Sequence, residues 1–277
     1  MVSVLNRGGR AKSDAAISAA IYEAVLTELG ATGTIVPLGD PIYRTGATTF
    51  RSVSGVSGLE TAIWTASEAP ELFATPPTRQ GICPVIHLNG SDEAIVSVDN
   101  SYWTVDDAGG ANGFSLGAWI NLPASTAEFG LLGKLGSNIN EWKLSIRSGF
   151  LPRLFLRDSS AGAGAYRIAD SAYGAAGEWH NILCVYNGNG GATAGAGITI
   201  YVDAVAVAQT ATENSGGTYV GMEDSLAIPM VGKGGTSEQW FNGKIAGGAS
   251  APFWTQAQLT AEQVMNIYRI QKGALAL

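Results

Sequence analysis

The sequence predicts an all-β protein built as a two-sheet antiparallel sandwich, with a helix near each end of the chain. Short strand patterns follow one another from residue 85 onward and are separated by glycine-rich turns. A long hairpin at residues 177–209 lies among them, and we expect it in the middle of a sheet. The two longest patterns with helical spacing lie at the two ends of the chain.

The hairpin consists of two strand patterns, residues 179–186 and 198–203, joined by a glycine-rich break. In the first strand Ile182 and Cys184 share one face, while Leu183 and the valine after Cys184 share the other. Both faces are apolar, which predicts a central strand in a sheet that is covered on both sides.

The N-terminal helix is predicted between Ser13, a candidate N-cap, and Gly30, a candidate terminator. Isolated helices of this length are marginal in water, so its narrow apolar stripe must dock on its own sandwich or on a neighbouring subunit. We expect residues 1–30 to form an assembly arm that can be removed without destabilising the sandwich. Its candidate residues are a basic group and the apolar stripe: Arg7, Arg10, Lys12, Ile17, Ile21, Val25 and Leu29.

Residues 31–80 are predicted to be an ordered connector, because prolines and Gly-Ser breaks punctuate them. Short strands are expected at 34–36 and 48–53, and a helical turn at 59–65. The expected organisation is therefore an arm, a connector and a sandwich, at residues 1–30, 31–80 and 81–277.

The remaining strand patterns of the sandwich are rich in β-branched and aromatic residues. Besides the hairpin they cover residues 85–88, 94–98, 114–122, 130–134, 142–146, 153–157, 166–168, 205–210, 226–231 and 241–246. A short C-terminal helix follows, in which Thr260 and Gln263 form a capping box and Gly273 lies beyond the expected end.

Composition excludes several functional classes. The chain of 277 residues has a net charge of −7, so it lacks the basic field that a nucleic-acid-binding protein needs. It has no apolar run near the roughly 18 residues of a membrane span, so no membrane insertion is expected. Charged residues make up 14%, against about 25% in ordinary soluble domains. This predicts either a neutral, loop-rich surface or a surface largely buried in an assembly.

The first residues lack the apolar core of a signal peptide, and two cysteines do not make a disulfide framework. We therefore expect a protein that is made in a reducing cytoplasm and stays there unless it leaves as part of a larger particle. Cys184 is expected to be a buried free thiol.

Several motifs resemble the laminin-G-like, concanavalin A-like jelly-roll family (lectins and glucanases). They occur in the family's order over residues 82–270 or so, at 88–93 (LNGSDE), 114–120 (FSLGAWI), 177–180 (GEWH), 200–203 (IYVD), 241–245 (FNGKI), 253–254 (FW) and 259–263 (LTAEQ). The resemblance implies a jelly roll and says little about function, because this fold carries lectins, enzymes, adhesion modules and virion appendages.

Two positions depart from the family's pattern. Where such domains often carry acidic residues near a calcium site, this chain has residues 246–248 (AGG), and we expect no high-affinity calcium site. The Asp-Gly turn that usually follows the 200–203 strand is Asp203-Ala204 here, which suggests an altered turn.

No pattern for catalysis or metal binding emerges from the residues. Glycosidases of related folds use a pair of carboxylates, and no strand shows such a cluster of acids. The two histidines, His87 and His180, have no neighbouring ligands at zinc spacing and are predicted to be strand residues with satisfied hydrogen bonds. We expect no catalytic residue, no metal and no cofactor.

Glycan binding remains as small-ligand chemistry, since sugars stack on exposed aromatic faces. Three tryptophans match core positions of the resembling family and are set aside: Trp119, Trp179 and Trp254. The candidates are Tyr102, Trp103, Tyr173 and Trp240, with subunit contact or edge packing as the alternative role for each.

These features favour a non-enzymatic virion structural protein, such as a phage capsid decoration, spike or tail-associated subunit, that displays the jelly roll. Its expected partners are further copies of itself, a capsid or other virion protein, and surface glycans. The alternative is a free lectin or carbohydrate-binding module, and an enzyme comes third.

Overall fold

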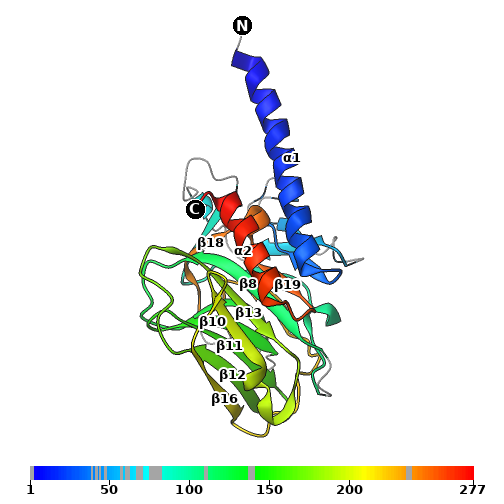
Figure 1. The fold of residues 1–277 in the computed structure, drawn as a ribbon, viewed down its shortest axis with the longest axis vertical. Helices are drawn as coiled ribbons and strands as arrows, with labels where there is room; N and C mark the ends of the chain where they lie inside the picture. Colours follow the sequence, from blue (N-terminus) through cyan, green and yellow to red (C-terminus); the bar gives the residue numbers. More distant parts are fainter. Residues whose placement is uncertain are drawn as a thin grey trace.

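A computed structural model describes residues 3–38, 40, 43, 45–46, 49–56, 59, 63–66, 71–74, 83–108, 112–136, 141–234 and 239–277, without the side chains of residues 3–15, 71–74 and 135. Two antiparallel sheets face each other, and two helices lie outside one of them (Figure 1). The predicted two-sheet sandwich, with a helix at each end of the chain, is confirmed.

The ten-stranded sheet has β8 at its centre. One edge of β8 pairs with β13, and the other pairs with β18 and β19 at different places along its length. The order β15-β14-β13-β8-β18-β6-β5 is completed by β19, β1 and β3, which pair in that sequence beyond β8. Its strands are β1 (Gly33–Ile35), β3 (Val53–Ser54), β5 (Glu71–Ala74), β6 (Val85–Asn89), β8 (Phe114–Asn121), β13 (Trp179–Tyr186), β14 (Ile198–Val202), β15 (Val205–Ala206), β18 (Asn242–Ala246) and β19 (Phe253–Thr255).

The nine-stranded sheet runs in the order β16-β12-β11-β10-β9-β17-β7-β4-β2. Its strands are β2 (Thr49–Arg51), β4 (Ile63–Ala66), β7 (Ile95–Val96), β9 (Phe129–Leu135), β10 (Trp142–Arg147), β11 (Leu151–Asp158), β12 (Ala163–Ala169), β16 (Gln209–Ser215) and β17 (Ile228–Val231). Strand β11 alternates between half-buried and buried side chains along its whole length. One face of this sheet therefore packs on the core while the other points outward.

The predicted hairpin is β13 and β14, paired in antiparallel register from Ile182 opposite Val202 to Tyr186 opposite Ile198. Ile182 and Cys184 lie in the core between the sheets, and Leu183 lies in a second core on the outer side. The prediction of a central strand covered on both sides is confirmed, and so is the buried free thiol of Cys184.

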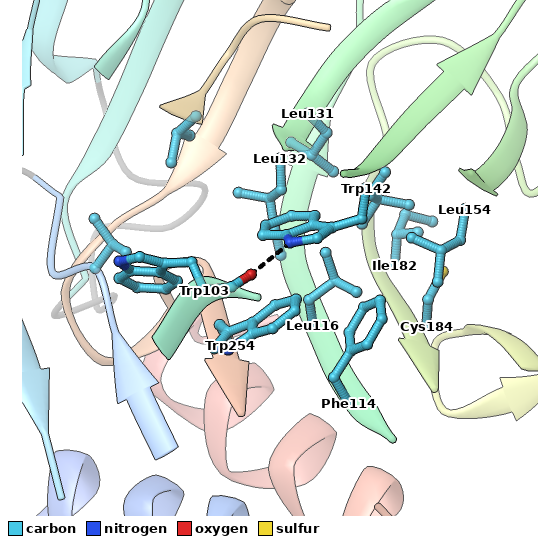
Figure 2. Close-up of a cluster of buried hydrophobic side chains, with 14 of the residues drawn as sticks. Trp103, Phe114, Leu116, Leu131, Leu132, Trp142, Leu154, Ile182, Cys184 and Trp254 are labelled. Carbon is cyan, nitrogen blue, oxygen red and sulfur yellow. Dashed lines mark hydrogen bonds between the residues drawn. The ribbon is translucent and has the colours of Figure 1, made fainter. Parts of the chain in front are cut away.

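Aromatic side chains fill the centre of the core between the sheets. The rings of Trp142 and Trp254 stack with centroids 4.5 Å apart and planes 18° apart, and Phe114 stacks on the other side of Trp254 at 4.5 Å. Trp142 Nε1 donates a hydrogen bond to the carbonyl of Trp103, which closes the cluster (Figure 2). Stacked aromatic pairs add about 0.5–1.5 kcal/mol beyond the area they bury.

Helix α1 (Ser3–Leu29) is longer than predicted, because it begins at Ser3 rather than after Ser13. It ends where predicted, at Gly30, whose φ of 77° suits a residue without a side chain. Its last two turns pack on the ten-stranded sheet, while its N-terminal half extends beyond the rest of the molecule (Figure 1).

This packing buries only the C-terminal part of the apolar stripe of α1. Val25 and Leu29 are fully buried beside the sandwich, Ile21 is half-buried, and Ile17 is 48% exposed. The surface on which the end of the stripe docks is therefore the chain's own sandwich. The expectation that residues 1–30 can be removed without loss of stability is wrong for the last turns of the helix, because their removal uncovers this second core.

The described residues of the 31–80 segment contribute strands β1 to β5 to both sheets. The helical turn predicted at 59–65 is wrong from residue 63 onward, because β4 pairs there with β2 and β7. Trp64 in this strand is buried while its neighbours Ile63 and Thr65 are exposed, which is the alternation of a strand with one inward face.

Two further boundaries differ from the predictions. The single strand expected at 205–210 is two strands, β15 and β16, which belong to different sheets, so the chain crosses between sheets at residues 207–208. Helix α2 (Ala261–Leu275) has the predicted capping box of Thr260 and Gln263, but Gly273 lies inside it. The helix ends instead at Ala276, whose φ is 56°.

Candidate functional site

The outward face of strands β10, β11 and β12 carries the candidate site. Helices α1 and α2 pack on the other sheet, so among the described residues no helix covers this face. The strand register places Lys143 beside Phe155, and Phe155 beside Tyr166. Two residue pairs further along, Arg153 lies beside Ser145 on the same face. We call this surface the β10–β12 face.

A cluster of charges lies at the centre of the β10–β12 face. Glu128, immediately before β9, accepts a hydrogen bond from Arg153 Nη2 and lies 2.9 Å from Lys143 Nζ. Arg147 Nε lies 3.8 Å from the second carboxylate oxygen. The side chains of Glu128, Lys143 and Arg153 are 16%, 12% and 14% exposed, whereas Arg147 is 47% exposed. Three cations thus surround one carboxylate in a half-buried setting.

The pKa values of Glu128 and Lys143 are both lowered by their surroundings in this cluster. Burial raises the pKa of Glu128, but the nearby Arg153 and Lys143 outweigh it, so the pKa is lowered overall. Burial lowers the pKa of Lys143, aided by Arg153 and Arg147, and Glu128 compensates in part. The Glu128 carboxylate is therefore ionised at neutral pH. The three cations around it carry more positive charge than this one carboxylate neutralises.

Two aromatic rings border the charges. The rings of Phe155 and Tyr166 have centroids 6.1 Å apart with planes 32° apart. The guanidinium carbon of Arg153 lies 5.7 Å from the first centroid and 5.5 Å from the second, within range of a cation–π interaction. On β12, a side chain at Gly164 would collide with the Phe155 ring, so this glycine allows the ring to lie across the strand.

The segment that precedes β18 borders the β10–β12 face on the β9 side. Gln239 Oε1 accepts a hydrogen bond of 2.6 Å from Lys143 Nζ, and its carbonyl accepts one from the amide of Gly130. Trp240, next along the chain, is half-buried and bridges to Lys233, whose Nζ lies 4.0 Å from the indole centroid. Of the predicted glycan-binding residues, Trp240 is the one that directly follows a residue of this face, Gln239, although its own ring contacts Lys233.

Tyr102 and Trp103 lie in the interior. They are 8% and 2% exposed, in a short turn capped by the Asn100 side chain. The hydroxyl of Tyr102 donates to the carbonyl of Thr32, and Trp103 belongs to the aromatic core. Their rings pack against other side chains, as Figure 2 shows for Trp103.

Tyr173 is half-buried at one end of the sandwich. Its ring meets Phe150 and His180 edge-on, at centroid distances of 5.6 and 5.1 Å. His180 Nδ1 lies 2.8 Å from Asp203 Oδ2, and its Nε2 lies 3.4 Å from Glu178 Oε2. The hydrogen bond to Asp203, together with the other contacts to the two carboxylates, outweighs burial and raises the pKa of His180. The prediction that His180 is a hydrogen-bonded strand residue is confirmed.

A second charge cluster is centred on Lys134, which is completely buried. Its Nζ lies 2.8 Å from Glu141, 3.0 Å from Asp99 and 3.2 Å from Asp224. Thr104 donates to the Glu141 carboxylate and accepts from the lysine. The cluster joins β9 to Glu141, the residue before β10, and to two loops, at the end of β10 opposite the β10–β11 turn. This cluster cannot be recognised from the sequence, because its members are far apart along the chain.

Within the described part of the chain, no group of three or more His, Cys, Asp or Glu residues has an arrangement that could hold a metal ion. Neither helix, nor any other in that part of the chain, is long and apolar enough to span a membrane.

The two facing antiparallel sheets of this jelly roll, one of which has an outward face that no described helix covers, define a lectin-like β-sandwich protein. The chain belongs to the concanavalin A-like lectin/glucanases superfamily, since the Laminin_G_3 family model matches residues 96–264. No curated protein sequence matches the chain.

Solved structures with the same fold are binding domains and an enzyme. The receptor binding domain of botulinum neurotoxin C/D mosaic serotype has a TM-score of 0.57 and 16% identity, covering 86% of this chain and 50% of that one. A botulinum neurotoxin type C structure, whose title states that cell entry depends on interaction with two ganglioside molecules, has a TM-score of 0.55 and 11% identity, covering 87% and 51%. Trypanosoma rangeli sialidase has a TM-score of 0.50 and 11% identity, covering 88% and 33%.

The chain thus spans about half the length of the neurotoxin domains that it matches. At these identities the likeness establishes the fold alone.

Proposed function

We propose that this chain is a non-enzymatic structural subunit of a virion, such as a phage capsid decoration, spike or tail-associated protein, and that its jelly roll binds glycans. The observation that carries glycan binding is the β10–β12 face, where ionic side chains and aromatic rings lie together outside the core. The neurotoxin binding domains with the same fold lend support, one of them through its interaction with gangliosides.

The chemistry of this face fits a sugar. Saccharides present apolar ring faces that stack on aromatic side chains and hydroxyls that need hydrogen-bond partners. Phe155 and Tyr166 are half-buried and supply the aromatic surface. Arg153, Lys143 and Gln239 supply donors and an acceptor around them.

The carboxylates of the two charge clusters argue for binding without hydrolysis. A glycosidase needs a general acid that keeps its proton near neutral pH, and so needs a carboxyl group with a raised pKa. Arg153 and Lys143 lower the pKa of Glu128, which makes it unsuited to that role. Glu141 is 1% exposed and paired with Lys134, so a substrate has no access to it.

Helix α1 supports the assembly role. Its last turns anchor it to the sandwich, and its N-terminal half extends away with Arg7 and Arg10 in its sequence (Figure 1). The whole chain has a net charge of −7, so a basic arm is attracted to the body of a neighbouring copy or to another acidic virion protein.

A glycan array probed with the purified full chain tests the binding role. We expect selective binding to a subset of glycans, and we expect Phe155→Ala to weaken it about tenfold by removing the aromatic surface. Ile63→Ala is the matched control, because Ile63 is an exposed apolar residue of the same sheet on β4. Equal loss in both variants, or no binding to any glycan by the intact chain, would contradict the proposal.

A further inference from the structure

The charge of the β10–β12 face is opposite to that of the chain. The protein has 16 Lys and Arg against 23 Asp and Glu, for a net charge of −7. On β10 and β11, by contrast, the outward positions carry Lys143, Arg147, Arg153 and Arg157. The carboxylate paired with three of them is Glu128. This face is therefore a basic patch on an acidic protein.

The excess of positive charge on this face has a larger energetic effect because two of the cations are mostly buried. Lys143 and Arg153 are 12% and 14% exposed, so water screens their charges poorly. Burial lowers the pKa of both side chains, and the positive charge of Arg147 beside them lowers it further. One carboxylate cannot balance three neighbouring cations. A second anion at this place would be stabilised by the same field that destabilises the cations.

Arg153 also has unused hydrogen-bonding capacity. Its Nη2 donates to Glu128, but its Nε is buried and finds no acceptor among the described residues. Guanidinium groups bind carboxylate and sulfate oxygens through paired N–H donors. A small reorientation of the Arg153 side chain would present a second donor to an incoming anion.

We propose that the β10–β12 face selects acidic glycans, those that carry a carboxylate or sulfate group, over their neutral counterparts. This inference rests on the proposed glycan-binding function and names its substrate class. The anionic group pairs with Arg153, Lys143 and Arg147, while the sugar ring packs on Phe155 or Tyr166.

The geometry favours an acidic sugar over a bare polyanion. The Arg153 guanidinium carbon lies 5.7 Å and 5.5 Å from the two ring centroids, so an anion bound there holds its attached pyranose ring against an aromatic face. A nucleic acid would instead need a long basic track, and this patch is enclosed by a protein of net charge −7.

Calorimetric titration with matched pairs of ligands tests the inference. The pairs are 3′-sialyllactose and lactose, galacturonate and galactose oligomers, and sulfated and unsulfated galactose oligomers. We expect the acidic member of at least one pair to bind about tenfold or more tightly, since a hydrogen bond to a charged group contributes about that much. The preference should shrink as salt is raised, because the Debye length falls.

Arg147→Gln and Lys143→Gln should each reduce the preference. Arg147 is 47% exposed, so its replacement leaves the fold intact even if the loss of Lys143 does not. Arg51→Gln is the control, because Arg51 is an exposed cation of the same sheet on β2. Equal affinity for every acidic and neutral pair overturns the inference and leaves glycan binding standing. Failure of every glycan to bind overturns the proposed function as well. Equally tight binding of single-stranded DNA would also overturn the inference, since the patch would then attract polyanions without regard to the sugar.

Discussion

Leu183 and Cys184 are neighbours in β13, both fully buried, yet they belong to two different cores. Cys184 faces the other sheet, and Leu183 faces helices α1 and α2. The molecule therefore has three layers: the nine-stranded sheet, the ten-stranded sheet and the helices. The helical layer lies on the side opposite the β10–β12 face, which no helix of the described residues covers and where we propose that glycans bind.

Leu29→Ala should destabilise the protein by about 2–5 kcal/mol, because it opens a cavity in the core beneath the helices. Leu29 is completely buried there. The matched control is Ile17→Ala in the same helix, where the side chain is 48% exposed and the change should be small. Urea unfolding measures both values. Equal stability of the two variants would show that α1 does not pack as described.

Removing residues 1–15 should leave the melting temperature nearly unchanged and should weaken self-association. This segment precedes the buried turns of α1, so its loss uncovers none of the second core. Size-exclusion chromatography with light scattering, compared between the full chain and the truncated one, measures the effect. Equal self-association of both would remove the support that the arm gives to a virion role.

Lys134→Met should destabilise the protein by about 3–5 kcal/mol, because it leaves the buried Glu141 carboxylate without its cation. Adding Glu141→Gln to the same chain should recover part of this loss, since it removes the unpaired charge. Thermal unfolding of the single and double variants checks the coupling. Strictly additive losses would show that the two side chains do not interact.

The same lysine predicts a response to alkaline pH. Burial lowers the pKa of Lys134, but its bonds to Glu141, Asp99 and Asp224 outweigh this and raise it above the ordinary value of 10.5. The stabilisation is therefore fully present below pH 10.5 and is lost as the pH rises through the raised pKa. Stability measured against pH should fall less steeply in that range for Lys134→Met.

His180 should titrate above its ordinary pKa of 6.5, because it donates a hydrogen bond to Asp203. Its contribution to stability is fully present below pH 6.5 and is lost as the pH rises through the raised value. Asp203→Asn keeps an acceptor for the backbone amide of Asn181 but removes the charge, so the pKa should fall. NMR titration of the imidazole measures this, and an unchanged pKa in the variant would contradict the assignment.

The sandwich could be predicted from the sequence because its strands are long enough to show alternation. Strand β13 revealed both of its buried faces, and Thr260 with Gln263 revealed the cap of α2. Strands β1 to β5 have two to four residues each, too few for a pattern, and β1 pairs with β19 some 220 residues away. The crossing at residues 207–208 could not be predicted, because residues 205–210 show one continuous strand pattern. In the structure, this pattern is divided between two strands of different sheets.

Part of the candidate site could be predicted from the sequence. Arg153, Phe155 and Arg157 alternate with buried leucines, so their shared outward face follows from the strand pattern. The pairing of Arg153 with Glu128 depends on the path of β9 and could not be predicted. The sequence suggests Tyr102 and Trp103 as glycan-binding aromatic residues, but both are buried in the turn capped by Asn100.

The most direct test of glycan binding at the β10–β12 face is an NMR titration of the isotope-labelled full chain with an oligosaccharide selected on the glycan array. We expect the largest amide shifts to cluster at Lys143, Arg153, Phe155, Tyr166 and Trp240, with little change along α1 and β13. Shifts confined to the loops at the ends of the sandwich, or to the helical layer, would contradict it.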